Sequence, residues 1–225
     1  MTERPLPVGK LSFEEFVAWC DEDTWAEWVD GRVVMVSPAS DRHQNLADFL
    51  TAVLRIYAES RNLGVVRSAP FLMRLPNIPS GREPDLLFVA AALRDRLMET
   101  YLDGQADLVV EIVSPESRLR DRGEKFAEYE LGGVPEYWIV DPHLRRADFY
   151  RLDPQGRYRL AEPDAGGAYW AGVIPGFWLR VEWLWQEPLP SPIRAVAEIA
   201  GVPSALLEAF ERALRGGEAS PPVDR

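Results

Sequence analysis

The chain has 225 residues, of which 47% are hydrophobic and 27% charged, so it can form a substantial core and is too apolar to be disordered. Its single cysteine, Cys20, excludes an intramolecular disulfide framework and a thiolate metal cluster built from one chain. The formal net charge of −11 argues against nucleic-acid binding, because phosphate binding usually rests on a basic surface.

The N-terminal part predicts a helix, a β-hairpin and a second, longer helix. Residues 12–20 begin with a capping-box pattern, a serine followed three residues later by a glutamate. Two β-rich runs then flank Asp30-Gly31, which is the strongest short signal for a hairpin. Ser40 or Asp41 caps the longer helix, whose apolar residues recur at helical spacing until Gly64 follows its end.

The middle of the chain predicts three strands and a short helix. Residues 65–75 form one predicted strand, 76–84 a loop and 85–89 a second strand. Residues 91–102 form a predicted helix. The stretch "LVVEIVSP", residues 108–115, is typical of a central strand that is covered on both faces.

The second half predicts a helix, a strand and a hairpin. Asp121 and Glu124 form another capping-box pattern, and the helix that they begin ends at Gly132-Gly133. Residues 135–142 form an apolar strand, and a hairpin turns around 153–156.

These elements predict an α/β architecture, with a mixed sheet flanked by helices, an N-terminal helix and a β-hairpin. Residues 1–185 form the predicted domain. Residues 186–225 form a predicted appendage: a proline-rich connector (186–193), an amphipathic helix (204–214) and a flexible tail (215–225).

Three carboxylates occupy predicted strands. Glu111 lies in the middle of residues 108–115, where an ionised carboxylate is costly unless it is paired, protonated or bound to a metal. Asp85 begins a strand directly after Pro84. Glu27 lies in the first strand of the hairpin. Each has a structural alternative: an ion pair for Glu111, a strand start for Asp85 and a solvent-facing position for Glu27.

Three further polar residues lie on helices beside these strands. His43 is in the first turn of the long helix, and Lys125 is in the first turn of the helix that follows Glu111. Tyr129 lies one turn after Lys125 on the same side. A solvated lysine, a surface histidine and a core tyrosine are the structural alternatives.

Neighbouring carboxylates repel each other unless one is protonated or a cation lies between them. Mg²⁺ or Mn²⁺ suits a site of oxygen ligands, which Asp85, Glu111 and the carbonyl of Ile112 can supply. Lys125 would place a positive charge beside a scissile phosphate. The pattern therefore predicts metal-assisted phosphodiester hydrolysis.

Pro84-Asp85 followed by Glu111-Ile112-Val113 resembles the PD-(D/E)xK nuclease superfamily, and more narrowly the Uma-two family of restriction endonucleases. The resemblance spans about residues 10–185. It is carried by "AEWVDG", the histidine after "SPAS", "REPDLLFV", "VVEIVSPES", "RDRGEKFAEY" and "GVPEYWIVDP". It implies a restriction-endonuclease-like core and a Mg²⁺-dependent DNA endonuclease. The usual superfamily lysine would fall at Val113, and Lys125 matches the place where the family has its lysine.

A basic run, "SRLRDRGEK", contains Arg118, Arg120 and Arg122, which either contact DNA phosphates or form a solvated face. The sequence contains no window of transmembrane length and no signal peptide, so a cytoplasmic protein without a membrane partner is predicted. Residues 177–185 and the C-terminal helix predict a homodimer surface.

Two other functions remain open at this point. Glu27 and Glu111 are the carboxylate pair that a metal-independent glycosidase would use, although Lys125 would then have no role. The protein is alternatively a non-catalytic interaction or regulatory protein on a nuclease fold, which its acidic composition favours.

Overall fold

The computed structural model describes residues 6–7, 9–21, 24–36, 39–75, 77–115 and 117–216, so most of the predicted tail lies outside the described residues. The α-helices are α1 (Phe13–Trp19), α2 (Asp41–Ser60), α3 (Lys125–Leu131), α4 (Pro192–Ile199) and α5 (Ser204–Leu214). Shorter helical turns are η1 (Ala91–Arg96), η2 (Arg120–Glu124) and η3 (Val181–Trp185).

The strands form three sheets. A six-stranded sheet has the order β11-β10-β9-β8-β6-β3, with β3 (Gly64–Ser68), β6 (Leu86–Ala90), β8 (Leu108–Ile112), β9 (Glu136–Asp141), β10 (Arg146–Leu152) and β11 (Tyr158–Ala161). A five-stranded sheet has the order β2-β1-β5-β4-β7, with β1 (Ala26–Val29), β2 (Arg32–Met35), β4 (Leu72–Leu75), β5 (Ser80–Arg82) and β7 (Tyr101–Asp103). The last pairs β12 (Ala168–Trp170) with β13 (Trp178–Arg180).

The two large sheets are mixed, as predicted. In the six-stranded sheet β8 and β9 are parallel and are connected through α3, while the other neighbours are antiparallel. In the five-stranded sheet only β4 and β7 are parallel. The crossover through α3 carries the chain from β8 past the end of the sheet where the polar residues lie.

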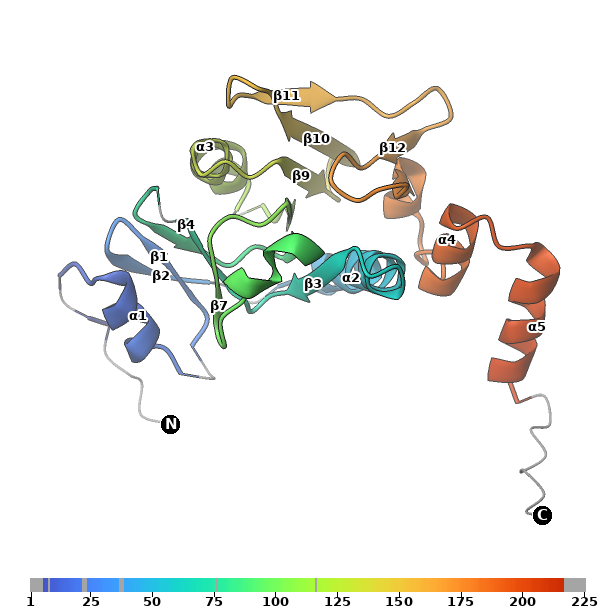
Figure 1. Ribbon diagram of the computed structural model, residues 1–225, viewed down its shortest axis with the longest axis horizontal. Coiled ribbons are helices and arrows are strands. Elements are labelled where there is room, and N and C mark those ends of the chain that lie inside the picture. Colours follow the sequence, from blue (N-terminus) through green and yellow to red (C-terminus); the bar gives the residue numbers. More distant parts are fainter. Residues whose placement is uncertain are drawn as a thin grey trace, which may run out of the picture.

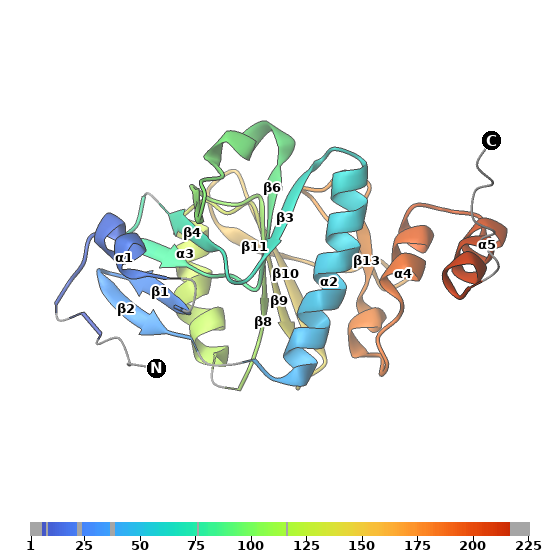
Figure 2. The ribbon, with the colours of Figure 1, turned by 90° about the horizontal axis from the view of Figure 1, so that it is seen from below.

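Helices and the five-stranded sheet cover the two faces of the six-stranded sheet. Figures 1 and 2 show α2 along one face, with α4 and α5 beyond it, and the sheet of β1, β2 and β4 on the side of α3. One core lies between α2 and the sheet and includes Leu50, Phe88 and Trp138. A second core lies under α3 and includes Tyr129 and Tyr137.

The alternation along β8 decides where Glu111 points. Leu108, Val110 and Ile112 belong to the core under α2, whereas Val109 and Val113 belong to the core under α3. Successive strand residues face opposite sides. Glu111 therefore faces α3, which carries Lys125 and Tyr129.

The sequence prediction was wrong at several short elements. Residues 65–75 are two strands, β3 and β4, that belong to different sheets, and the chain turns between them at Ala69-Pro70. The predicted loop 76–84 contains β5, and the predicted helix 91–102 is η1 followed by β7. Strands of three residues form because neighbouring strands pair with them, which local propensity does not reveal.

Two helix starts also differ from the prediction. Asp121 and Glu124 make no capping hydrogen bond. Instead, Ser114 and Ser117 each donate a backbone N–H to the other's hydroxyl, at 3.0 Å in both directions, and the chain becomes helical from Arg118. Helix α4 was not predicted; it begins in the last two residues of the predicted connector, where Pro192 at the first position is compatible with a helix start.

Helices of the described part of the chain are all too short or too polar to cross a membrane.

Candidate active site

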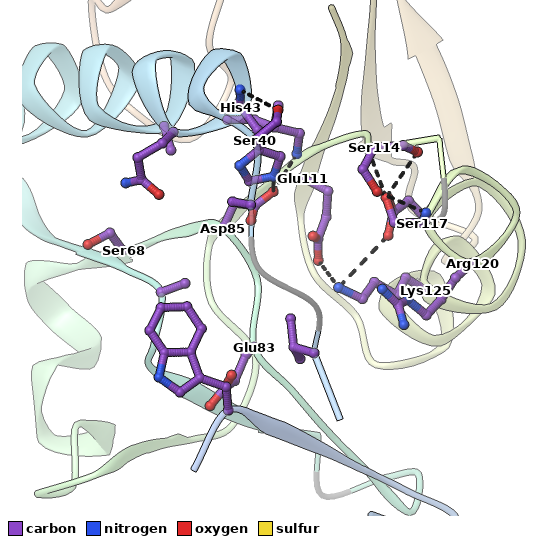
Figure 3. A pocket seen from close by; sticks show the side chains of 18 of the residues that line it. Ser40, His43, Ser68, Glu83, Asp85, Glu111, Ser114, Ser117, Arg120 and Lys125 are labelled. Atoms are coloured by element: carbon purple, nitrogen blue, oxygen red, sulfur yellow. Dashed lines mark hydrogen bonds and ion pairs between the residues drawn. The ribbon is translucent and has the colours of Figure 1, made fainter. Parts of the chain in front are cut away.

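A cavity of about 740 Å³ is lined by the hairpin of β1 and β2, the beginning of α2, the starting end of β6 and the far end of β8. Figure 3 shows Asp85, Glu111 and Lys125 close to one another around this cavity. Glu27 and His43 line the same cavity. The fold thus brings together residues from five separate elements that the sequence analysis singled out.

Asp85, the residue directly before β6, lies beside Glu111 of the neighbouring strand β8. Leu86 pairs with Val110 in the antiparallel register, and extending it by one residue sets Asp85 opposite Glu111. Asp85 Oδ2 accepts a hydrogen bond from the backbone N–H of Ile112 at 2.6 Å. The two predicted carboxylate ligands therefore adjoin each other, and Asp85 contacts the backbone of Ile112, the residue whose carbonyl is the third predicted ligand.

Glu111 is a buried carboxylate with two donors. Its Oε1 accepts from Lys125 Nζ and from the Tyr129 hydroxyl, each at 2.8 Å. Burial raises the pKa of Glu111 to about 8; Lys125 acts against this, and the nearby Asp121 and Asp85 raise it further. One ammonium thus does not compensate the carboxylates gathered here, and a further cation would favour the ionised form of Glu111.

Glu27 is buried and lies between two cations, so its alternative assignment as a solvent-facing residue is wrong. Its Oε1 lies 3.0 Å from Lys125 Nζ, and its Oε2 accepts from Arg82 Nη1 at 2.9 Å. Burial opposes ionisation, but Lys125 and Arg82 outweigh it and lower the pKa of Glu27 to about 2. Burial likewise opposes the charge of Lys125, but Glu111 and Glu27 raise the pKa of that amine.

Arg82 holds Glu27 in place through a hydrogen bond, and the sequence analysis did not identify Arg82 as part of the site. Its side chain is 1% exposed, and its Nε and Nη2 bond both oxygens of Glu128 at 2.8 and 2.7 Å. The Ser80 hydroxyl donates to the same carboxylate at 2.5 Å. A planar guanidinium that bonds two carboxylates in this way fixes Glu27, and through it Lys125. The signal available was the position of Arg82 in "REPD", immediately before the predicted ligand Asp85.

His43 contacts the metal-ligand candidates from the start of α2. Its Nε2 lies 3.2 Å from Asp85 Oδ2, and its backbone N–H donates to the Ser40 hydroxyl that caps the helix. Burial lowers the pKa of His43, but the hydrogen bond and charge of Asp85 outweigh it, with a contribution from the Ile112 backbone, and the net shift is upward. This placement suits the predicted supporting role beside Asp85.

Three more carboxylates, which the sequence analysis did not assign to the site, line the cavity: Asp48, Glu83 and Asp121. Burial raises the pKa of Glu83 to about 7, and Glu27 adds to this while Lys125 opposes it. Asp121 is 1% exposed, and burial raises its pKa despite Lys125, whose Nζ is 3.9 Å away. The sequence analysis interpreted Asp121 as a helix-capping residue and therefore did not place it at the site. In the structure η2 turns its side chain inward.

The basic run is divided by the structure. Arg118 pairs with the buried Asp141 at 3.2 Å, and Arg122 pairs with Asp148 at 2.5 Å. Arg120 lines the cavity, and among the described residues it has no ion pair within 4.0 Å. Of the three arginines, Arg120 is therefore the one that lines the cavity without an ion pair among the described residues.

The oxygen-rich lining of the cavity suits a hard divalent metal such as Mg²⁺. Among the described residues, no group of three His, Cys, Asp or Glu side chains is arranged as a metal site. Mg²⁺ does not need one, since it usually keeps several waters and binds one or two carboxylates together with substrate phosphate. The adjoining carboxylates of Asp85 and Glu111, beside the Ile112 backbone in a cavity with surplus carboxylates, fit that pattern.

Comparisons with known proteins agree with this fold. The profile of the Uma2 family, described as "Putative restriction endonuclease", matches residues 13–182. An uncharacterized protein of Synechocystis, slr1290, is 24% identical over 156 residues, covering 68% of this chain and 80% of that protein. A crystal structure from Anabaena variabilis, titled as a "putative nuclease belonging to DUF820", superimposes with a TM-score of 0.65 at 14% identity. The match covers 78% of this chain and 97% of that one.

The likeness to the Anabaena protein shows a shared fold, which confirms the predicted mixed α/β architecture of the restriction-endonuclease-like type. The profile match covers most of the chain, including Glu27, Asp85, Glu111 and Lys125. The chain belongs to the Uma2 family.

Proposed function

We propose that the protein is an endonuclease that hydrolyses DNA phosphodiester bonds and depends on Mg²⁺ or Mn²⁺. One observation carries the proposal: the buried ammonium of Lys125 bonds Glu111 at 2.8 Å, directly beside Asp85, in an open cavity. A positive charge and two adjoining carboxylates are the groups that metal-assisted phosphoryl transfer uses.

Asp85, Glu111 and the carbonyl of Ile112 would hold the metal. When bound, such a cation stabilises charge on the phosphate and lowers the pKa of water. Lys125 keeps its proton, because its neighbours raise its pKa. It therefore serves as a fixed positive charge at the phosphate and not as a general base. Arg120 contributes a second positive charge from the cavity wall.

Glu27 has a different role in this proposal. Each of its oxygens contacts a cation, Lys125 at 3.0 Å and Arg82 at 2.9 Å. It therefore positions Lys125 and is not a metal ligand. This arrangement also disfavours the glycosidase, since Lys125 lies between Glu27 and Glu111 in the place that a sugar would need.

The proposal is tested by incubating the protein with plasmid and oligonucleotide DNA in Mg²⁺, Mn²⁺ or EDTA. We expect cleavage only with metal, and none by Glu111→Gln. Millimolar metal should raise the melting temperature of the wild type but not of Glu111→Gln. Glu99→Gln, which changes an exposed carboxylate, is the matched control and should behave like the wild type.

A wild-type protein that binds metal but cleaves no DNA would favour the regulatory alternative. A melting temperature that no divalent metal changes would contradict the metal site itself.

A further inference from the structure

An exposed tryptophan lies at the wall of the candidate active site. Trp25 directly precedes β1, lines the cavity and is 47% exposed. Met35 at the end of β2 lines the same cavity and is 51% exposed. The hairpin register sets Trp25 opposite Val36, whose N–H donates to the Trp25 carbonyl at 3.0 Å, and Met35 opposite Ala26. Large apolar side chains exposed at a cavity usually mark a binding surface.

The indole of Trp25 is free to receive a ligand. Within the described residues it has no hydrogen bond, ring or cation partner. The cavity lining near the hairpin continues through uncharged residues, Val36 and Ala39. Ser68 is another uncharged lining residue, and Figure 3 shows it on the opposite side of the view from Lys125 and Arg120. The cavity thus combines charged groups with an exposed aromatic side chain beside the hairpin.

Charge alone gives this protein little affinity for a nucleic acid. Its formal net charge is −11, and two of the three arginines in the basic run are paired with aspartates. Duplex binding normally draws most of its affinity from phosphate contacts. Single-stranded nucleic acid can also bind through stacking of its bases on aromatic side chains.

We propose that Trp25 forms a stacking site for an unpaired nucleobase next to the scissile phosphate, so that the preferred substrate is single-stranded or locally unpaired. The proposal rests on the nuclease function above. Asp48 and Glu83 also line the cavity and disfavour a phosphate there, but a neutral base tolerates them. In a duplex the bases are stacked on one another and cannot reach the indole.

The test is fluorescence anisotropy of a labelled oligothymidylate and of a duplex of equal length, with the full-length protein in EDTA so that no cleavage occurs. We expect tighter binding of the single strand. Trp25→Ala should weaken that binding roughly 5- to 140-fold, as loss of one stacked base does, while Trp25→Phe should retain most of it. Trp170→Ala is the matched control, because Trp170 is 50% exposed and lies outside the cavity.

Equal affinity of wild type and Trp25→Ala for the single strand would overturn the stacking site, even if both cleave DNA with Mg²⁺. So would a change in oligomeric state on Trp25→Ala without a change in affinity, because the indole would then belong to a protein interface. Conversely, Trp25-dependent binding without any cleavage under Mg²⁺ or Mn²⁺ would support the stacking site and contradict the nuclease proposal.

Discussion

Glu111 shows how this fold accommodates a carboxylate inside a core strand. Val109 and Val113, on the same face of the strand, are buried in the core under α3, and the Glu111 side chain is 4% exposed. Lys125 and Tyr129 each donate a hydrogen bond to the same oxygen of Glu111. A buried ion pair of this kind is rarely kept for stability alone, since an apolar pair of similar volume often does as well. This favours a functional reason for Glu111.

Replacement of Lys125 separates metal binding from catalysis. In Lys125→Ala the oxygens of Asp85, Glu111 and Ile112 remain, so Mg²⁺ should still raise the melting temperature. Cleavage should fall on the order of a hundred- to a thousandfold, because one preorganised charge is lost at the phosphate. Lys125→Arg should restore little, since a planar guanidinium presents its donors differently. Single-turnover cleavage provides the measurement, and a wild-type rate in Lys125→Ala would contradict the assignment.

Glu27 should make the protein sensitive to acid. Its pKa is lowered to about 2 from 4.5, so its contribution to stability is complete above about pH 4.5 and is lost as the pH falls towards 2. The shift corresponds to about 3 kcal/mol. Urea unfolding of wild type and Glu27→Gln between pH 7 and pH 2 measures it. Glu27→Gln should have a lower free energy of unfolding than the wild type at pH 7, and this free energy should fall less on acidification. If the free energies of the two proteins fall in parallel with pH, the ion pairs of Glu27 do not contribute to stability.

At the scale of elements, the sequence predicted what has a strong local pattern. The capping box at Ser12 and Glu15, the turn at Asp30-Gly31 and the long helix that Ser40 caps are all present. Strand β5 was not predicted, because a three-residue strand depends on its neighbours β1 and β4. For the same reason Arg82, which lies on β5, was overlooked at the site.

The predicted convergence of Asp85, Glu111 and Lys125 did follow from the sequence, because adjacent strands and the helix after them must meet at one end of a sheet. The burial of Glu27 and Asp121 did not follow. The burial of these two residues depends on how the five-stranded sheet and η2 pack over that end of the six-stranded sheet. Contacts between such distant segments leave no local pattern in the sequence.

Arg120 and Arg122, the two arginines of η2, should differ in their contribution to DNA binding. Arg120→Ala should weaken binding without regard to sequence and lower the slope of log affinity against log salt by roughly one. Arg122→Ala is the control, because Asp148 keeps a second partner, Arg146, at 2.9 Å. Its salt slope should match that of the wild type. Equal salt slopes for the wild type, Arg120→Ala and Arg122→Ala would show that Arg120 does not contact a phosphate.

At the scale of the whole molecule, the structure narrows the predicted dimer surface. Most of the segment 177–185 is committed to its own core, with Phe177, Leu184 and Trp183 buried. Helix α5 has no buried residue, and Leu206, Phe210 and Leu214 are 63%, 51% and 62% exposed along it. The homodimer prediction therefore rests on α5, which lies at the far end of the molecule from α1 (Figure 1).

If two copies associate through α5, Phe210→Glu should give a monomer, because a charge cannot be buried in an apolar interface. Sedimentation velocity at micromolar concentration provides the measurement. Glu208→Gln changes a side chain that is 62% exposed on the same helix and serves as the control. A wild type that sediments as a monomer would contradict the dimer prediction.

The π-helical turn of η2 also limits how this family member can vary in length. The Lys125 N–H bonds the Arg120 carbonyl, five residues back, so the turn holds one residue more than a regular α-helix would. Deleting exposed Gly123 would restore the usual register and rotate Arg120 and Asp121 by about 100° relative to Lys125. The number of residues between Ser117 and Lys125 therefore matters for the geometry of the site. Deleting one residue there should reduce cleavage about as much as removing Lys125.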